Sequence, residues 1–300
     1  MRSQSPKVST FEGGSDLSSR LTAPGTKSSG VVQYLHLQSR YNSFDMIDGI
    51  RVLAIVPARK GSKGLPGKNG RVLLGRPLLS WSVAAALGSR CVDRIIVSTD
   101  DAVLAEIARE AGAEVPFMRP MHLAEDRTPS ADVILHALDM LAELGDSFGY
   151  IVLLEPTSPL TEGADVDAAL ARLHGARDRA DAIVGIVRTD ADHPSFAVAM
   201  ANDGTILPIA GGGFAGLPRR QDLIAAYRLE GSLYASDVRT FRAIKSFCHA
   251  RTIGYLVPRY KSLEVDDLVD FVCIEAIARS LAELRADLGV SNSNGEVGRQ

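Results

Sequence analysis

The chain has 300 residues, of which 46% are hydrophobic and 23% charged, an ordinary balance for a soluble globular protein. Its 33 basic and 36 acidic residues give a net charge of −3, which argues against a dedicated binder of nucleic acid or anionic membranes, since such proteins are usually strongly basic. The three cysteines lie far apart without a CxxC pair, which predicts free thiols in the cytoplasm, and no apolar run is long enough for a membrane-spanning helix.

The first 48 residues differ in composition from the rest of the chain. They include ten serines, and their only apolar patch is 31–37. A secretory signal needs a continuous apolar stretch after a basic start, and this segment has none. We therefore predict a disordered N-terminal extension over 1–48, with Met46 as an alternative start, and a second disordered tail over 289–300.

From residue 49 onward, short apolar runs alternate with segments of helical periodicity. Strands are predicted at 52–56, 94–98, 113–118, 150–154 and 182–187, and helices at 78–87, 102–111, 131–144 and 166–173. Strands that are separated by helices form βαβ units, in which the strands run parallel. The predicted fold class is therefore α/β, with a mostly parallel, doubly wound sheet.

The alternation stops between residues 196 and 234. Asn202-Asp203-Gly204 is typical of a hairpin turn, and a glycine-rich stretch follows it. Further strands near 232–235 and 252–257 and a helix over 267–288 complete the pattern. We interpret 49–288 as one domain that carries an inserted subdomain at 196–234.

The loop after the first predicted strand is basic and rich in glycine. It reads PARKGSKGLPGKNG over 57–70, and between residues 49 and 92 there are eight Lys and Arg but no acid. In α/β sheets, ligands bind beyond the carboxyl ends of the strands, and glycines let backbone N–H groups approach an anion closely. The loop therefore predicts a polyphosphate site, the alternative being a solvated basic loop.

The spacing of the glycines distinguishes among phosphate-binding motifs. Gly61, Gly64 and Gly67 do not form GxGxxG, which argues against a dinucleotide-dependent dehydrogenase. Five residues separate Gly61 from Gly67, and Lys68 is followed by Asn69, so the motif is not that of a P-loop kinase either.

The motif PAR-x-GSKGLP-x-KN at this position resembles the acylneuraminate cytidylyltransferases, also called CMP-sialate synthetases. Further family motifs follow in order: IIVSTDD, RP, LLEPTSPL, RRQD…YR-x-x-G-x-LY and EVDDLVDF. The resemblance implies a Rossmann-like nucleotidyltransferase fold and a homodimer formed through 196–234. It also implies an enzyme that uses CTP and Mg²⁺ to activate a nine-carbon 2-keto sugar acid, with release of pyrophosphate, for surface polysaccharide or glycan synthesis.

The same resemblance assigns roles to individual residues. Arg59 and Lys68 would be catalytic, because they would neutralise charge on the leaving pyrophosphate. The residues implied to bind the nucleotide are Ala58, Gly61, Ser62, Gly64, Asn69, Arg119 and Ser130, and those implied to bind the sugar acid are Glu155, Arg220, Arg228 and Glu230.

Two carboxylates near the C-terminus, Glu264 and Asp266, match the metal ligands of the family. On an extended segment they would point the same way, and Mg²⁺ prefers one or two carboxylates together with phosphate oxygens and water. The alternative is that Asp266 or Asp267 merely caps the final helix.

Three glutamates depart from the family pattern. Glu155 replaces a glutamine, Glu230 an asparagine and Glu264 an aspartate. An ionised glutamate cannot donate a hydrogen bond as glutamine can, so we expect Glu155 to disfavour N-acetylneuraminate relative to a nonulosonic acid with other amino or deoxy substituents.

Other functions stay open at this point. A related enzyme could activate a different keto-sugar acid, such as the eight-carbon 3-deoxy-octulosonate. A non-catalytic nucleotide sensor on the same scaffold is the alternative from another class. We expect no nucleic-acid or membrane partner.

Overall fold

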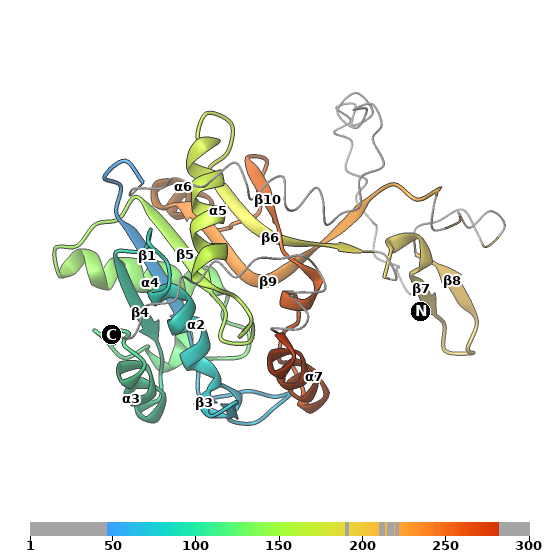
Figure 1. The fold of residues 1–300 in the computed structure, drawn as a ribbon, viewed down its shortest axis with the longest axis horizontal. Coiled ribbons are helices and arrows are strands. Elements are labelled where there is room, and N and C mark those ends of the chain that lie inside the picture. The colour runs from blue at the N-terminus through green and yellow to red at the C-terminus, as the bar shows by residue number, and fades with distance from the viewer. Residues whose placement is uncertain (1–46, 190–191, 210–213, 215–218, 220–221, 282–300) are drawn as a thin grey trace, which may run out of the picture.

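The computed structural model describes residues 47–189, 192–209, 214, 219 and 222–281 (Figure 1). The segments expected to be disordered lie outside these residues, except for Ile47 and Asp48. Arg220 and Met46 also lie outside them.

A six-stranded sheet forms the centre of the molecule. Its strands are β1 (Val52–Pro57), β4 (Arg94–Ser98), β5 (Tyr150–Leu154), β6 (Ala182–Thr189), β9 (Ala226–Asp237) and β10 (Thr252–Leu256). The strand order is β10-β6-β9-β5-β1-β4. The pairings of β1 with β4, β1 with β5 and β10 with β6 are parallel, and only β9 runs antiparallel to its neighbours. The sheet is thus mostly parallel, as predicted.

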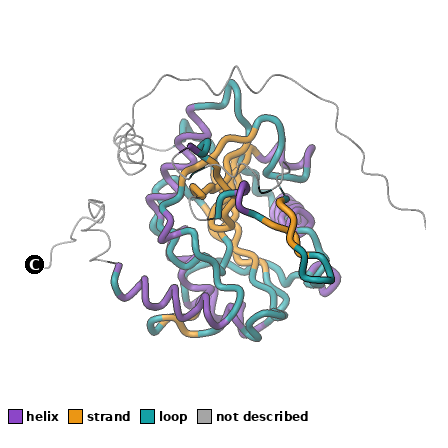
Figure 2. The backbone as a smooth tube through the Cα atoms, turned by 90° about the vertical axis from the view of Figure 1, so that its right-hand side faces the viewer, coloured by secondary structure: helices purple, strands orange, loops and turns teal. Residues whose placement is uncertain are grey.

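Helices cover both faces of this sheet (Figure 2). They are α2 (Leu78–Leu87), α3 (Ala102–Glu110), α4 (Ser130–Glu143), α5 (Gly163–Gly175), α6 (Val238–Ile244) and α7 (Leu268–Arg279). Alternate residues of β1 enter two different cores. Val52, Ala54 and Val56 pack with α2, α3 and α5, whereas Leu53 and Ile55 pack with α4 and α6. A strand that is buried on both faces explains the continuous apolar run in the sequence.

A third apolar cluster attaches α7 to the loop after β1. Val265, Phe271 and Ile274 pack against Leu65 and Leu73. The C-terminal part of the chain therefore closes over the basic loop, which brings residues about 200 positions apart into contact.

A hairpin of β7 (Val198–Met200) and β8 (Ile206–Pro208) projects from the body beyond the ends of β6 and β9 (Figure 1). The turn predicted at Asn202-Asp203-Gly204 joins its two strands. β9 is one strand of 12 residues, and all but its last three fall within the stretch interpreted as the insertion.

Two local predictions differ from the structure. Residues 113–118 do not form a strand, because only Glu114 makes a single bridge, to Ile96. The small hairpin of β2 (Val72–Leu73) and β3 (Arg76–Pro77) and the helix α6 were not predicted. None of the described helices is both long and apolar enough to cross a lipid bilayer.

Candidate active site

Two adjoining cavities open at the carboxyl ends of β1 and β5. The larger, of about 510 Å³, is lined by the basic loop, the turn after β5, β9 and the segment before α7. The smaller, of about 240 Å³, lies between the basic loop and the start of α4. Pro57, Arg59 and Glu155 line both cavities, so the two form one continuous site. We call them the large and the small cavity.

Two cations of the basic loop converge on one carboxylate. Asp126 binds Arg59 Nη1 through Oδ1 at 2.6 Å and Lys63 Nζ through Oδ2 at 2.5 Å. Hydrogen bonds from these two side chains lower the pKa of Asp126 below its usual range. A carboxylate held by one cation on each oxygen resembles a bridging phosphate, so the loop is arranged to bind an anion.

Lys68 joins the basic loop to the segment that precedes α7. Its Nζ donates to the Val265 carbonyl at 2.8 Å and lies 3.3 Å from Asp266 Oδ1. Gly64 permits this close approach, since a Cβ at that position would lie 2.2 Å from the Asp266 carbonyl oxygen. The adjacent Asn69 is buried and donates from Nδ2 to the Arg59 carbonyl at 3.0 Å, which fixes the loop internally.

The segment 262–266, which we call the acidic segment, presents two carboxylates to the large cavity. Val265 is fully buried between them, and its N–H donates to the Thr157 carbonyl at 2.8 Å. Glu264 and Asp266 therefore face the cavity together. Glu264 Oε1 accepts from the Gly231 N–H at 2.7 Å, whereas Asp267, and not Asp266, caps α7.

This donor set fits Mg²⁺. The carboxylates of Glu264 and Asp266 both offer hard oxygen ligands. Within the described residues, no group of three or more His, Cys, Asp or Glu residues could hold a metal by itself. Mg²⁺ usually binds through one or two carboxylates and completes its shell with phosphate oxygens and water. Glu264 and Asp266 beside the basic loop match that pattern.

Glu155 lies at the junction of the two cavities. Burial, together with the negative charge of Glu264, raises its pKa to about 7. This shift favours the protonated form of Glu155, which can donate a hydrogen bond. The raised pKa works against the full ionisation on which the expected discrimination against N-acetylneuraminate rests, and that sugar preference stays a prediction.

Arg119 forms the floor of the small cavity. It is 5% exposed, and its Nε donates to Ser98 Oγ at 3.1 Å. Burial lowers its pKa to about 10, which still leaves it charged at neutral pH. Ser130, the first residue of α4, lines the same cavity, and no side chain caps that helix. A buried cation and a free helix N-terminus both favour electron-rich ligand atoms.

The structure gathers most of the residues to which the resemblance assigned roles. The large cavity is lined by Arg59, Gly61, Ser62, Gly64, Lys68, Asn69, Glu155, Glu264 and Asp266, and the small one by Arg119 and Ser130.

Three assigned residues lie outside both linings. Ala58 is buried, and its N–H donates to the Ser98 carbonyl at 2.9 Å. Arg228 is exposed and donates to the Ser262 carbonyl at 3.3 Å, so it contacts the acidic segment. Glu230 is 1% exposed and accepts from the Ser232 hydroxyl at 2.6 Å, which turns its carboxylate away from the large cavity.

Several lining residues had no assigned role. Asp126 belongs to none of the quoted motifs. Only its ion pairs with Arg59 and Lys63 in the folded structure identify it as a residue of the site. Gly231 and Tyr234 are the glycine and the last tyrosine of the quoted motif YR-x-x-G-x-LY. That motif could have identified them as residues of the site.

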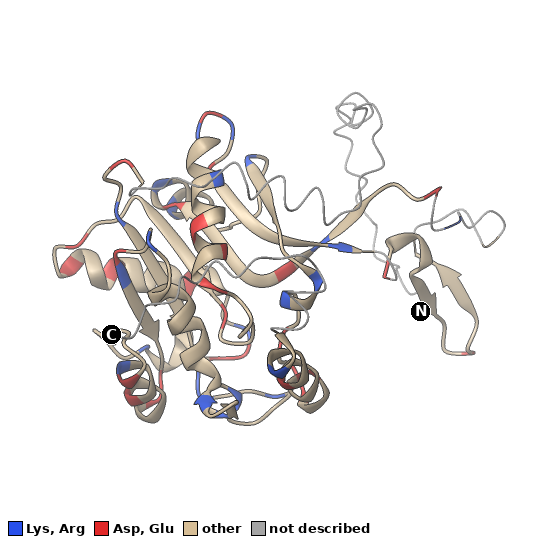
Figure 3. Ribbon diagram, viewed as in Figure 1, with Lys and Arg blue, Asp and Glu red and all other residues tan. Residues whose placement is uncertain are grey.

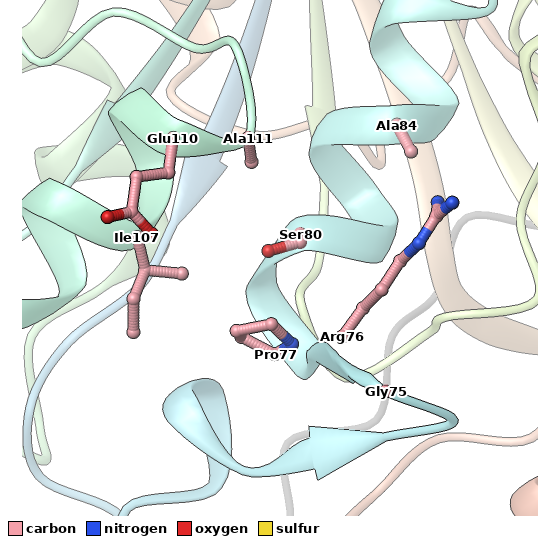
Figure 4. Close-up of a pocket in the computed structure, with 8 residues that line it drawn as sticks. All are labelled: Gly75, Arg76, Pro77, Ser80, Ala84, Ile107, Glu110 and Ala111. Atoms are coloured by element: carbon pink, nitrogen blue, oxygen red, sulfur yellow. The ribbon is translucent and has the colours of Figure 1, made fainter.

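A separate hollow of about 350 Å³ lies between the start of α2 and the end of α3 (Figure 4). Ser80 and Pro77 face Ile107 and Glu110 across it. It shares no lining residue with the two cavities of the site.

Comparison with known proteins identifies relatives along most of the chain. The sequence model of the cytidylyltransferase family matches residues 53–248. The chain is 29% identical over 238 residues to the N-acylneuraminate cytidylyltransferase of Escherichia coli, which covers 79% of this chain and 54% of that protein. It is 30% identical over 229 residues to the CMP-N,N'-diacetyllegionaminic acid synthase of Legionella pneumophila, which covers 76% of this chain and 96% of that protein. The chain thus spans about half the length of the first relative and nearly all of the second.

A solved structure shares the fold. CMP:2-keto-3-deoxy-manno-octonic acid synthetase complexed with CTP matches 77% of this chain and 99% of its own, with a TM-score of 0.54 and 19% identity. This likeness confirms the predicted fold class.

Proposed function

Since this chain belongs to the cytidylyltransferase family, as its motifs predicted, we propose that it transfers a cytidylyl group from CTP to a sialic-acid-like 2-keto-3-deoxy sugar acid and releases pyrophosphate. The observation that carries the proposal is the large cavity, which is lined both by the cations Arg59, Lys63 and Lys68 and by the carboxylates of Glu264 and Asp266.

The small cavity suits the base of the nucleotide. The Arg119 guanidinium donates to Ser98 from Nε and Nη2, which leaves its other N–H donors for a ligand. Among the described residues, no carboxylate forms an ion pair with Arg119. Cytosine presents two acceptors side by side, O2 and N3, to such a planar donor. Uracil carries a hydrogen on N3, which would face the guanidinium donors, and this difference favours CTP over UTP.

The basic loop suits the triphosphate. Arg59 and Lys63 already bind the Asp126 carboxylate, and a phosphate group would take its place between them. Cations held beside the leaving group stabilise the charge that grows there in the transition state. The anomeric oxygen of the sugar acid would bond to the α-phosphorus while the bond from that phosphorus to the pyrophosphate oxygen breaks, and the proton of the anomeric hydroxyl would pass to water.

Glu264 and Asp266 would hold the Mg²⁺ ion. The metal would neutralise phosphate charge, which is the chemistry such ions usually supply in nucleotidyl transfer. The Gly231 N–H orients Glu264 for this role by binding one of its oxygens.

The remaining part of the large cavity suits the sugar acid. Tyr234 lines it beside Glu155, and burial raises the pKa of Tyr234, so its hydroxyl stays a donor. Glu155 can donate when protonated and accept when ionised, so we propose a preference for a nonulosonic acid other than N-acetylneuraminate that changes with pH near 7. Glu155→Gln should remove that pH dependence.

The β7–β8 hairpin supports a homodimer. Met200, Leu207 and Ile209 on and beside it are 75%, 61% and 67% exposed. Figure 3 shows few charged residues on this hairpin. Exposed apolar patches of this kind usually mark an interface. We place the enzyme in the cytoplasm, where CTP is available and thiols such as those of Cys91, Cys248 and Cys273 stay free.

A panel of pyrophosphate-release assays tests the proposal. Each of the four nucleoside triphosphates is combined with N-acetylneuraminate, a di-N-acylated nonulosonic acid or 3-deoxy-octulosonate, with Mg²⁺ or with EDTA. We expect release with CTP and a nonulosonic acid, and none in EDTA. Release with octulosonate alone would assign a different sugar, and CTP binding without release for any acid would support a sensor.

A further inference from the structure

A buried ion cluster connects the acidic segment to the start of α5. Lys261 is the last residue of the short helix η7 (Arg259–Lys261), and its Nζ lies 2.5 Å from Asp165 Oδ2 and 2.8 Å from Glu162 Oε2. Lys261 and Asp165 are each 5% exposed. A buried ammonium group is tolerated only where charges and hydrogen bonds compensate its lost hydration, so this contact is a strong geometric constraint.

The partners of Lys261 are themselves fixed. Asp165 Oδ2 also accepts from the Glu162 N–H at 2.9 Å, which closes the capping box of α5. Asp165 Oδ1 accepts from the Tyr255 hydroxyl at 3.1 Å, which links the cluster to β10. Lys261 is thus anchored to a helix terminus and to a strand of the central sheet.

The chain runs directly from this anchor to the two carboxylates of the site. Glu264 follows Lys261 by three residues and Asp266 by five, with no helix or strand between them. Between these carboxylates, the backbone of Val265 is held by Thr157 and by Lys68. Because an irregular segment has no internal ladder of hydrogen bonds, its anchored end and its bonds to neighbouring elements determine where its side chains point. Besides the two bonds of Val265, these are the bonds from Arg228 to Ser262, from Gly231 to Glu264 and from Asp266 to Asp270.

Lys261 stays charged at neutral pH. Burial acts to lower the pKa of Lys261, but the attraction of Asp165 and Glu162 is larger and raises that pKa above its ordinary value. The ammonium group that contacts Asp165 and Glu162 is therefore a cation at neutral pH.

We infer that Lys261 is a positioning residue, whose buried contacts with Asp165 and Glu162 hold the acidic segment so that Glu264 and Asp266 face the large cavity. The inference rests on the proposed function, because the orientation of these carboxylates matters to activity only where a nucleotide and its metal bind. Lys261 itself lines neither cavity.

Three variants of the full chain test this role. Lys261→Met removes the ammonium but keeps most of the side-chain volume, and Lys261→Arg keeps a cation that can bridge two carboxylates. Arg259→Met is the matched control, because Arg259 is an exposed cation of the same short helix. The first readout is the hydrogen-exchange rate of the Val265 amide in the nucleotide-free protein. The other two are the Mg²⁺ concentration for half-maximal pyrophosphate release and the Kd for CTP in EDTA.

We expect Lys261→Met to accelerate exchange of the Val265 amide by about tenfold and to raise the required Mg²⁺ concentration by about tenfold, while the Kd for CTP in EDTA stays within about threefold. Lys261→Arg should restore both quantities to within about threefold of wild type, and Arg259→Met should match wild type. Unchanged exchange, or faster exchange with an unchanged Mg²⁺ requirement, would overturn the inference.

Two further outcomes are decided by the same measurements. If Lys261→Met also loses protection of the β1 amides, it is globally unfolded, and Glu162→Gln replaces it. Glu162 is partly exposed, and glutamine preserves the helix cap, so a folded protein with faster Val265 exchange is expected and unchanged exchange overturns the inference. If wild type releases no pyrophosphate under any condition, the proposed function fails, whereas the exchange of Val265 still decides whether Lys261 holds the segment.

Discussion

Two glutamates of this molecule occupy space that a glycine leaves open. A Cβ at Gly231 would lie 2.4 Å from Glu264 Oε2, and one at Gly185 would lie 1.7 Å from Glu230 Oε1. The β6–β9 ladder is irregular between Val184 and Ile186, and this irregularity frees the Gly231 N–H for Glu264. The glutamate at position 264, which is one methylene longer than the aspartate of the family pattern, is therefore accommodated by its surroundings.

We predict that Gly231→Ala lowers kcat by about tenfold or more in the wild-type background and has little effect in a Glu264→Asp background. The added methyl would push the Glu264 carboxylate from its position, whereas the shorter aspartate leaves room for it. Gly231 is not among the glycines with positive φ, so alanine fits its backbone. Steady-state kinetics of the four proteins measure the coupling. Gly175→Ala is the control, because no atom lies within 4 Å of its added Cβ. If Gly231→Ala lowered kcat equally in the wild-type and Glu264→Asp backgrounds, the steric contact between Gly231 and Glu264 would not explain the loss.

The cations of the basic loop carry a second prediction. Arg59→Ala and Lys68→Ala should each lower the rate of the chemical step by roughly 10²–10³, because a preorganised charge at the leaving group is lost. Single-turnover kinetics with CTP measure the step, and thermal unfolding shows whether the fold persists. Lys60→Ala is the control, since Lys60 is 76% exposed and pairs with Asp101. Near-wild-type rates in either variant would remove these residues from the mechanism.

The buried Glu230 predicts a dependence of stability on pH. Burial raises its pKa from 4.5 to about 7, although hydrogen bonds from Ser232 oppose the shift. Between these values the native state binds a proton that the unfolded chain has lost, so the free energy of unfolding falls as pH rises. The full pKa shift of Glu230 corresponds to a change of about 3 kcal/mol in the free energy of unfolding. Urea unfolding at pH 5 and pH 8 should show a smaller loss in Glu230→Gln than in wild type. The same loss in both proteins would contradict the assignment.

At the scale of elements, the sequence predicts best where a single physical cause dominates. β4 and β5 match their predicted bounds because buried strands read as continuous apolar runs. Residues 113–118 are also mostly apolar, but they include Pro116, lie at the sheet edge beyond β4 and make only one bridge. The seven-residue α6 was missed because so short a helix depends on its packing, through Phe241, and not on periodicity.

The projecting hairpin carries the prediction at this scale. We expect the wild-type chain to be a dimer and the double variant Met200→Asp/Leu207→Asp to be a monomer, because a charge opposes burial of these exposed side chains. Light scattering coupled to size-exclusion chromatography gives the mass. Val103→Asp is the control, since Val103 is 69% exposed on α3, away from the hairpin. A dimeric double variant would place the interface on another surface. A monomeric wild type would contradict the homodimer itself.

At the scale of the whole molecule, the topology gathers the site. β1, β4 and β5 are parallel neighbours, so the loops that follow them meet at one edge of the sheet, where the sequence placed the ligand. Motifs could identify Arg59, Lys68 and Asp266 as candidates. They could not reveal that Asp126 pairs with Arg59, or that Lys261 anchors the acidic segment, because those contacts join residues 67 and 96 positions apart. Such pairings depend on the packed fold and leave no local pattern.

The central claim is that the cytidylyl group of CTP is transferred to the sugar acid, and phosphorus NMR of one reaction tests it most directly. The protein is incubated with CTP, Mg²⁺ and a di-N-acylated nonulosonic acid, and the spectrum is followed with time. We predict that the three resonances of CTP are replaced by one phosphodiester resonance and that of pyrophosphate, in equal molar amounts. Persistence of CTP, or its conversion to CMP or CDP without a phosphodiester, would contradict the account.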